Sequence, residues 1–223
     1  MNDFNQRLHA AWARGQGINL AGATYGRQHW GGFETATEPE PYYTFLAGLC
    51  AEYGCQRVLE IGTHTGGSAV AMARGMQAAG ITTPRLVTID LNTTSDSYLP
   101  HQPEAPFITK IVGDANNTKT VLDAIAAFSE QPIDMMYIDG DHMFEPTFNA
   151  LATYSTLLAP RLVVIDDITL NGSMQLMWRF LKKAPAFHDI VNVADIIPAV
   201  RPLVDGHNAG FGVIQLRVDD ESH

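Results

Sequence analysis

Short apolar runs rich in β-branched residues alternate with helical patterns from residue 57 onward. The runs are RVLEI at 57–61, RLVTI at 85–89, FITKIV at 107–112, IDMMYI at 133–138 and RLVVI at 161–165. Apolar residues recur with helical spacing at 68–79, 118–128, 146–158 and 173–183. Continuous apolar strands between helices are typical of a sheet buried on both faces, so the pattern predicts an α/β fold with a mostly parallel sheet.

The two ends of the chain depart from this alternation. Two strand patterns, at 188–193 and 210–218, have no helical pattern between them, so we expect an antiparallel hairpin at one edge of the sheet. Residues 1–56 show no strand pattern; they contain a predicted helix at 41–53 and a glycine- and aromatic-rich stretch at 24–33, expected to be a loop or cap near a site. No linker divides the chain, which predicts one continuous domain.

The most informative segment is VLEIGTHTGGSAVAMA at 58–73, in which a strand leads through a glycine turn into a helix that opens near Ser68. Ligands of open parallel sheets bind beyond the carboxyl ends of the strands, where glycine allows close backbone approach and a helix start offers free N–H groups. We therefore predict a ligand site at this turn. Its spacing, G-x-x-x-G-G, differs from the dinucleotide fingerprint G-x-G-x-x-G, which disfavours nicotinamide cofactors.

This turn resembles the first motif, E/D-x-G-x-x-x-G, of the class I S-adenosylmethionine-dependent methyltransferases. The run GSAVAMAR further resembles the O-methyltransferases that act on catechols. The resemblance implies a Rossmann-like fold: a mostly parallel seven-stranded sheet with a C-terminal antiparallel hairpin. It makes residues 57–223 the S-adenosylmethionine-binding domain and residues 1–56 a helical cap and substrate region. It also assigns Gly62, Thr63 and Gly66 to the methionine part of the cofactor, with Ser68 at the helix start and Glu60 as an orienting carboxylate.

Further cofactor residues are expected at the ends of the next two strands. Asp90 ends the second strand, where a carboxylate can accept hydrogen bonds from both ribose hydroxyls. Gly113, Asp114 and Ala115 follow the third strand, where the family places a residue on the adenine amino group. The alternative for either aspartate is that it caps loop backbone N–H groups.

Three aspartates end the fourth and fifth strands: Asp139, Asp166 and Asp167. Crowded carboxylates imply a cation, and an all-oxygen set favours a hard divalent metal such as magnesium. The resemblance adds that metal-dependent O-methyltransferases of the catechol and caffeoyl type carry an Asp-Asn pair on the fifth strand. The Asp-Asp pair here is closer to bacterial sugar and macrolide enzymes. The resemblance to these families also places Asp139 near the cofactor. Asp141 or Asn171 could complete or support the ligand set, and the alternative is that Asp166 and Asp167 cap the next helix or turn.

His142 is the candidate general base. It lies three residues after Asp139, where the catechol and caffeoyl families carry a lysine. Imidazole groups exchange protons near neutral pH, which suits removal of a proton from a hydroxyl. The alternative is a surface histidine hydrogen-bonded to Asp141. His29, Trp30 and His207 are weaker candidates for the substrate side of the site.

Composition limits the classes of partner. The 223 residues include 14 Lys and Arg against 24 Asp and Glu, a formal charge of −10 without a basic patch, which disfavours nucleic acid and anionic membranes. No apolar run could span a bilayer, and the start of the sequence does not read as a secretion signal, so we expect a cytoplasmic protein. Homo-oligomer formation is left open.

The sequence therefore predicts an S-adenosylmethionine-dependent O-methyltransferase for a small hydroxylated molecule, with a divalent metal and His142 as base. Two alternatives are a metal-independent methyltransferase that uses His142 alone and a noncatalytic cofactor-binding scaffold. The segment 92–106, which contains Pro100, Pro103 and Pro106, should not form a long helix and is a candidate lid or partner surface.

Overall fold

A seven-stranded sheet forms the centre of the protein in the computed structural model, which describes residues 2–23, 25–29, 32–36, 41–184, 187, 189–200, 203–204 and 207–216. The strand order is β5 (Ile108–Val112), β4 (Arg85–Asp90), β3 (Arg57–Ile61), β6 (Met135–Ile138), β7 (Leu162–Asp166), β11 (Phe211–Gln215) and β8 (Asp189–Asn192). The first five are parallel, whereas β11 runs antiparallel to both β7 and β8. The predicted parallel sheet and its C-terminal hairpin are both confirmed.

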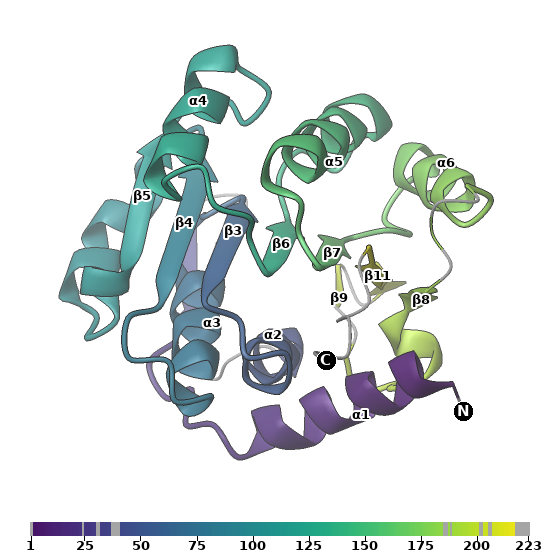
Figure 1. Ribbon diagram of the computed structural model, residues 1–223, viewed down its shortest axis with the longest axis horizontal. Helices are drawn as coiled ribbons and strands as arrows, with labels where there is room; N and C mark the ends of the chain where they lie inside the picture. Colours follow the sequence, from purple (N-terminus) through teal and green to yellow (C-terminus); the bar gives the residue numbers. More distant parts are fainter. Residues whose placement is uncertain are drawn as a thin grey trace.

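Helices cover both faces of this sheet (Figure 1). One face carries α1 (Asp3–Gln16), α2 (Pro41–Glu52) and α3 (Gly67–Ala78). The other carries α4 (Thr118–Ala127), α5 (Phe144–Leu158) and α6 (Gly172–Leu181). The four helices predicted after residue 57 and the one predicted at 41–53 are present, with ends shifted by up to two residues.

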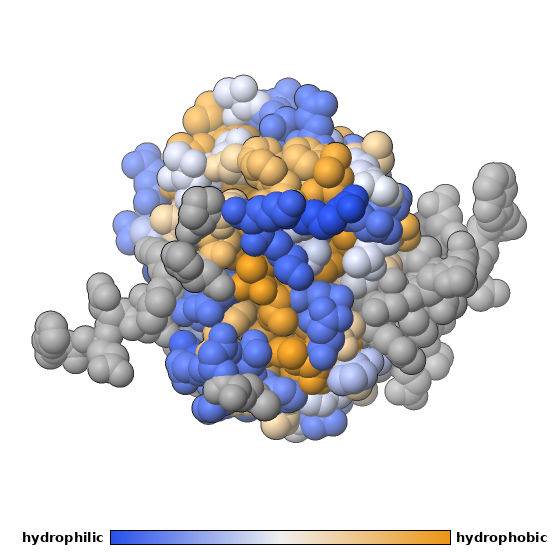
Figure 2. Space-filling model, turned by 90° about the vertical axis from the view of Figure 1, so that its right-hand side faces the viewer, coloured by the Kyte–Doolittle hydropathy of each residue, from blue (hydrophilic) through white to orange (hydrophobic). Residues whose placement is uncertain are grey.

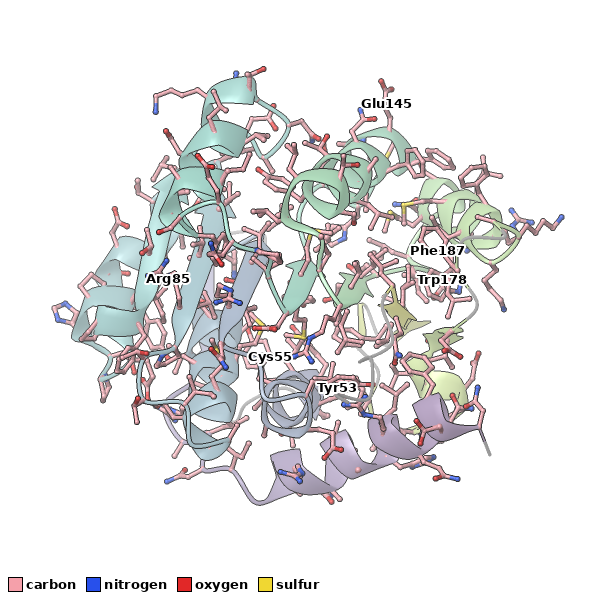
Figure 3. All side chains as sticks on the ribbon, in the orientation of Figure 1. Tyr53, Cys55, Arg85, Glu145, Trp178 and Phe187 are labelled. Atoms are coloured by element: carbon pink, nitrogen blue, oxygen red, sulfur yellow. The ribbon has the colours of Figure 1, made fainter. Side chains whose placement is uncertain are left out.

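The apolar strands supply the core on both sides of the sheet. In β7, Leu162 and Val164 belong to the core beneath α1–α3, while Val163 and Ile165 belong to the core beneath α4–α6. Because side chains alternate between faces, a strand with two buried faces needs apolar residues at every position. Trp178 closes the second core: it reaches from α6 toward β11 (Figure 3), where a Cβ on Gly212 would lie 2.6 Å from its ring.

Helix α1 was not predicted from the sequence. Asn2 caps it by accepting a hydrogen bond from the backbone N–H of Asn5, at 2.9 Å. Its buried residues, Phe4, Leu8, Ala11 and Gly15, follow helical spacing. The helix then crosses α2 very closely, since a Cβ on Gly15 would lie 2.0 Å from the carbonyl oxygen of Thr44. Small residues at this crossing therefore join α1 to the main core.

The prediction that residues 24–33 form a loop is wrong. Strands β1 (Tyr25–His29) and β2 (Gly32–Ala36) pair as an antiparallel hairpin outside the main sheet. Its pairing is local and needs no alternating apolar face, so the periodicity of side chains gave no signal. Trp30 lies outside the described residues. A second small hairpin pairs β9 (Leu203–Val204) with β10 (His207–Asn208).

The segment between β4 and β5 has no long helix, as its prolines predict. It forms three short 3₁₀ turns, η1 (Thr94–Ser97), η2 (Leu99–His101) and η3 (Ala105–Phe107), and a fourth, η4 (Val193–Asp195), follows β8. Arg74 of α3 donates to the Glu104 carboxylate at 2.9 Å and also to the carbonyl oxygens of Asn19 and Ala21. These bonds tie the segment to α3 and the N-terminal region.

The surface at the α6 and β8 side of the molecule has both apolar and hydrophilic areas. Figure 2 faces the side that carries α6 and β8 and shows an apolar strip between hydrophilic areas. No helix among the described residues is long and apolar enough to cross a membrane.

Candidate active site

A cavity of about 610 Å³ lies at the carboxyl ends of the parallel strands. Its walls include most of the residues predicted for the cofactor, the metal and the base. These are Gly62, Thr63, Ser68, Asp90, Gly113, Asp114, Ala115, Asp139, His142, Asp166 and Asp167. Glu60 and Gly66 are not among the residues that line the cavity.

Gly62 forms the tight turn after β3. Its backbone N–H donates to the Ile89 carbonyl at 2.8 Å, and the Asp139 N–H donates to the Ile61 carbonyl at 2.7 Å. With φ at +99°, Gly62 is in a conformation that favours glycine, and a Cβ there would lie 1.8 Å from the backbone oxygen of Asp139. The turn is therefore pressed against the end of β6, and no side chain fits between them.

Glu60 lies beneath this turn and is fully buried. Its carboxylate accepts hydrogen bonds from Ser68 Oγ and Thr88 Oγ1, both at 2.5 Å, and Thr88 Oγ1 is 2.6 Å from Thr63 Oγ1. Burial raises the pKa of Glu60 to about 7, although both hydroxyl hydrogen bonds lower it. Glu60 therefore positions Thr63 and Ser68, which line the cavity, rather than lining it itself.

Gly66 precedes α3 and faces the segment between β4 and β5. Its φ is +93°, and a Cβ would lie 2.5 Å from the side chain of Leu99, which is buried. Its lack of a side chain therefore allows Leu99 to dock on the start of α3. We conclude that the glycine serves this packing contact, whereas its proximity to a bound ligand stays a prediction.

Asp90 and Asp114 both accept hydrogen bonds from loop backbone and both line the cavity. The Asp90 carboxylate accepts from the N–H groups of His64, at 2.7 Å, and Asn92, at 3.0 Å. Asp114 Oδ1 accepts from the Asn116 N–H at 2.8 Å. Both aspartates cap loop backbone and also line the cavity. Each carboxylate oxygen has a second lone pair, which leaves acceptor capacity toward a ligand.

The carboxylates of β6 and β7 converge as predicted. Tyr137 Oη lies 3.0 Å from Asp139 Oδ2 and 3.1 Å from Asp166 Oδ2, and Asp166 Oδ1 accepts from the Asp167 N–H. Burial and the neighbouring carboxylates raise the pKa of Asp139 and that of Asp166 well above the ordinary value. Negative charge is thus destabilised here, and a nearby positive charge would relieve it.

Asp167 and His142 face each other across this cluster. His142 Nδ1 lies 3.4 Å from Asp167 Oδ2, and His142 Nε2 lies 3.7 Å from Asp139 Oδ1. Asp167 has φ at +55°, a sparsely populated conformation for a residue with a side chain. Burial raises the pKa of Asp167, and the charge of His142 opposes that effect. Asp167 Oδ1 is buried without a hydrogen-bond partner.

The three carboxylates predicted to bind a metal lie close together, but the His142 imidazole shares the space between them. The single proton of the Tyr137 hydroxyl can be donated to either Asp139 or Asp166, and Asp166 Oδ1 accepts from the Asp167 N–H, while the His142 imidazole lies between Asp139 and Asp167. Within the described ranges, no group of three His, Cys, Asp or Glu side chains is arranged to hold a metal ion. Carboxylate oxygens are suitable donors for magnesium, but we derive no reaction step through a metal.

Several residues of the site were not expected from the sequence. Tyr42 and Tyr43, at the start of α2, line the cavity, and Tyr137 bridges the carboxylates. Each of these tyrosines lies in an apolar pattern that indicates core packing, so the sequence did not single out its hydroxyl group as part of a site. Asn171, proposed to complete or support the ligand set, accepts from the Met174 N–H at the start of α6 and donates to the His142 carbonyl at 2.8 Å. It therefore supports the loop that carries His142.

A family model described as a methyltransferase domain matches residues 59–168. No curated protein sequence matches the chain significantly. Among solved structures, cofactor-bound Rv0187 from MTB is 19% identical, with 96% of this chain and 91% of that chain covered and a TM-score of 0.64.

Two other solved structures are named O-methyltransferases. TomG from Streptomyces achromogenes, involved in tomaymycin synthesis and in complex with S-adenosylmethionine, is 17% identical, with 98% and 91% of the two chains covered and a TM-score of 0.62. The enzyme from Bacillus cereus, in complex with S-adenosylhomocysteine, is 15% identical, with 97% and 92% covered and a TM-score of 0.61. Residues 59–168 thus match a methyltransferase domain, and the chain has the fold of these O-methyltransferase structures.

Proposed function

We propose that the protein transfers a methyl group from S-adenosylmethionine to a hydroxyl oxygen of a small molecule. One observation carries this proposal: a single cavity joins the Gly62 turn and strand-end Asp90 to His142 and the carboxylates around it. A cofactor and an acceptor bound in that cavity would have their reacting groups close together, which is the main requirement for methyl transfer.

The residues at the different strand ends would each hold a different part of the cofactor. Gly62 and Thr63 would hold the methionine part, Asp90 would accept from the ribose hydroxyls, and Asp114 with its neighbours would hold the adenine. Glu60 would support the methionine end through its hydrogen bond with Ser68, and Gly66 would do so through its contact with Leu99. S-adenosylmethionine, when bound, supplies an electrophilic methyl group on a positively charged sulfur.

His142 would accept the proton of the acceptor hydroxyl. The acceptor oxygen then forms a bond to the methyl carbon as the carbon–sulfur bond breaks, and the electron pair of that bond stays on sulfur. Asp139 and Asp167 lie on either side of the imidazole, where their charge would stabilise the imidazolium that forms. Asn171 holds the His142 backbone in place by donating a hydrogen bond to the His142 carbonyl.

The substrate end would include the N-terminal region. Tyr42 and Tyr43 are the described residues of 1–56 that line the cavity, and they come from the helix that precedes β3. This placement supports the assignment of residues 1–56 to acceptor binding.

A metal-assisted reaction is the second candidate, supported by the unpartnered Asp167 Oδ1 and the crowded carboxylates. A divalent ion would neutralise that charge and orient the acceptor. Excess chelator separates the candidates: lost activity that magnesium restores supports the metal, and full activity in chelator excludes it.

Transfer of labelled methyl from S-adenosylmethionine to a panel of hydroxylated acceptors tests the proposal. With an accepted substrate, His142→Ala should lower turnover by roughly 10² to 10⁴, the usual contribution of a general base. His101→Ala, which changes an exposed histidine outside the cavity, is the matched control and should keep full activity. Cofactor binding without transfer to any acceptor would instead favour the noncatalytic scaffold.

A further inference from the structure

Helices α5 and α6 share an apolar outer face. The ring centroids of Phe144 and Phe148 in α5 are 5.8 Å apart, and the ring of Phe180 in α6 lies 6.1 Å from the first and 5.6 Å from the second. Phe180 is 49% exposed, and Leu176, one turn earlier on α6, is 55% exposed. Met143, directly before α5, is 50% exposed. These five residues are called the α5–α6 face below.

This face is not needed to attach the two helices to the sheet. The inner sides of the helices already pack in the core, through residues such as Leu151 and Tyr154 of α5 and Met174 and Met177 of α6. Neighbouring apolar side chains that stay exposed on a folded chain mark an interaction site. Figure 2 looks onto the side of α6 and shows apolar areas directly beside strongly hydrophilic ones.

Opposite charges lie at the two ends of the α5–α6 face. The helices begin side by side, since the Phe144 N–H donates to Ser173 Oγ at 2.8 Å. Glu145, in the first turn of α5, is exposed and points away from the molecule (Figure 3). Arg179 and Lys183 are exposed at the far end of α6. Acid therefore lies at one end of the apolar residues and base at the other.

These charges are available to a partner. Within the part of the chain that the structure describes, Glu145, Arg179 and Lys183 take part in none of the ion pairs. Arg179 donates only from Nε, to the Gln175 carbonyl at 3.2 Å, so its terminal N–H groups point to no protein acceptor there. A carboxylate from outside could accept from them in a paired, directional contact.

The arrangement is complementary to itself. A two-fold axis that crosses the phenylalanines between Glu145 and Arg179 would bring Glu145 of each copy to Arg179 of the other. The apolar residues of the two copies would then cover each other, and each acid would meet a base. An anionic lipid surface fits less well, because the chain carries a net charge of −10 that opposes its approach.

We propose that the α5–α6 face binds a second copy of this chain, in a symmetric dimer that pairs Glu145 of each copy with Arg179 of the other. The inference goes beyond the proposed function, because it concerns assembly and not methyl transfer. It also bears on the site: Asp141 and His142 line the cavity and directly precede Met143, so the second copy would lie beside the cavity mouth.

Sedimentation velocity over a range of protein concentrations tests the apolar part of the face. Wild type should change from monomer to dimer between about 1 and 200 µM, as expected for a small interface of micromolar affinity. Leu176→Ser should weaken association at least about tenfold, the loss expected for an apolar contact at the centre of an interface. Leu122→Ser, which changes a 60% exposed leucine of α4, is the matched control and should dimerise like wild type.

A charge exchange tests the pairing of the two copies. Glu145→Arg and Arg179→Glu should each weaken the dimer, because each places like charges opposite one another. The double variant exchanges acid and base and keeps the net charge, so it should restore the dissociation constant to within about threefold of wild type. Circular dichroism confirms that each variant is folded.

Four results would each overturn the inference: a wild-type chain that stays monomeric up to about 200 µM, a dimer that tolerates Leu176→Ser, a dimer that tolerates both single charge changes, or a double variant that does not recover. A monomeric chain that floats with phosphatidylglycerol vesicles would identify a lipid surface as the occupant and would also overturn it. Because sedimentation does not depend on methyl transfer, failure of the proposed function would leave these outcomes unchanged.

Discussion

Replacing Glu60 with glutamine should change how stability depends on pH. The native pKa of about 7 exceeds the ordinary value of 4.5 because the side chain is buried. Between these values the native protein binds more protons than the unfolded chain, so this group favours folding at low pH. That contribution is lost as pH rises through 7. At about 1.4 kcal/mol for each pKa unit, the loss over the whole pH range is at most ~3.5 kcal/mol, nearly all of it above pH 4.5.

Glutamine cannot titrate, yet it can still pair with Ser68 and Thr88 because both hydroxyls can rotate. The unfolding free energy of Glu60→Gln relative to wild type should therefore rise by up to ~3 kcal/mol between pH 4.5 and 8. Urea unfolding followed by circular dichroism at several pH values measures it. The exposed Glu145→Gln should run parallel to wild type. A parallel curve for Glu60→Gln as well would refute the reasoning about this buried carboxyl.

Three further substitutions test the turns and the core. Gly62→Ala should weaken S-adenosylhomocysteine binding more than tenfold and lower the melting temperature, because its Cβ would press on the Asp139 carbonyl; unchanged affinity would show that the turn can open freely. Gly66→Ala and Leu99→Ala should each lower the free energy of unfolding. The double variant should lose at least ~0.5 kcal/mol less than the sum of the two single losses, because Leu99→Ala makes room for the new methyl group. A strictly additive loss would contradict the contact between Gly66 and Leu99. Trp178→Ala should cost about 3 to 5 kcal/mol in unfolding free energy by urea titration, since the ring fills the space between α6 and Gly212; a loss near zero would contradict that packing.

The sheet could be predicted from the sequence because its strands are buried on both faces. Runs such as RLVVI leave no polar face, and the chemistry of their carboxyl ends follows from the parallel direction of the strands. The convergence of Asp139, Asp166 and Asp167 was therefore predictable from their positions alone. The glycine turn was equally predictable, since its residues lie directly after a strand.

Contacts between distant segments were not predictable in the same way. The buried face of helix α1 ends in the small residues Ala11 and Gly15, and its place depends on a close crossing with α2 through Gly15. Gly66 reads as a ligand-binding glycine, but its neighbour is Leu99, more than thirty residues away in a segment without regular pattern. The imidazole of His142 lies between Asp139 and Asp167, two of the proposed metal ligands, and the sequence did not indicate this because side-chain directions in a loop do not follow from spacing.

Calorimetric titration of S-adenosylhomocysteine, with and without saturating reduced nicotinamide cofactor, tests most directly whether the cavity at the strand ends is a methyltransferase cofactor site. The account predicts one bound molecule per chain with micromolar or tighter affinity, and the same dissociation constant in both titrations. It would be contradicted by an absence of binding heat, or by a nicotinamide cofactor that displaces S-adenosylhomocysteine from the cavity.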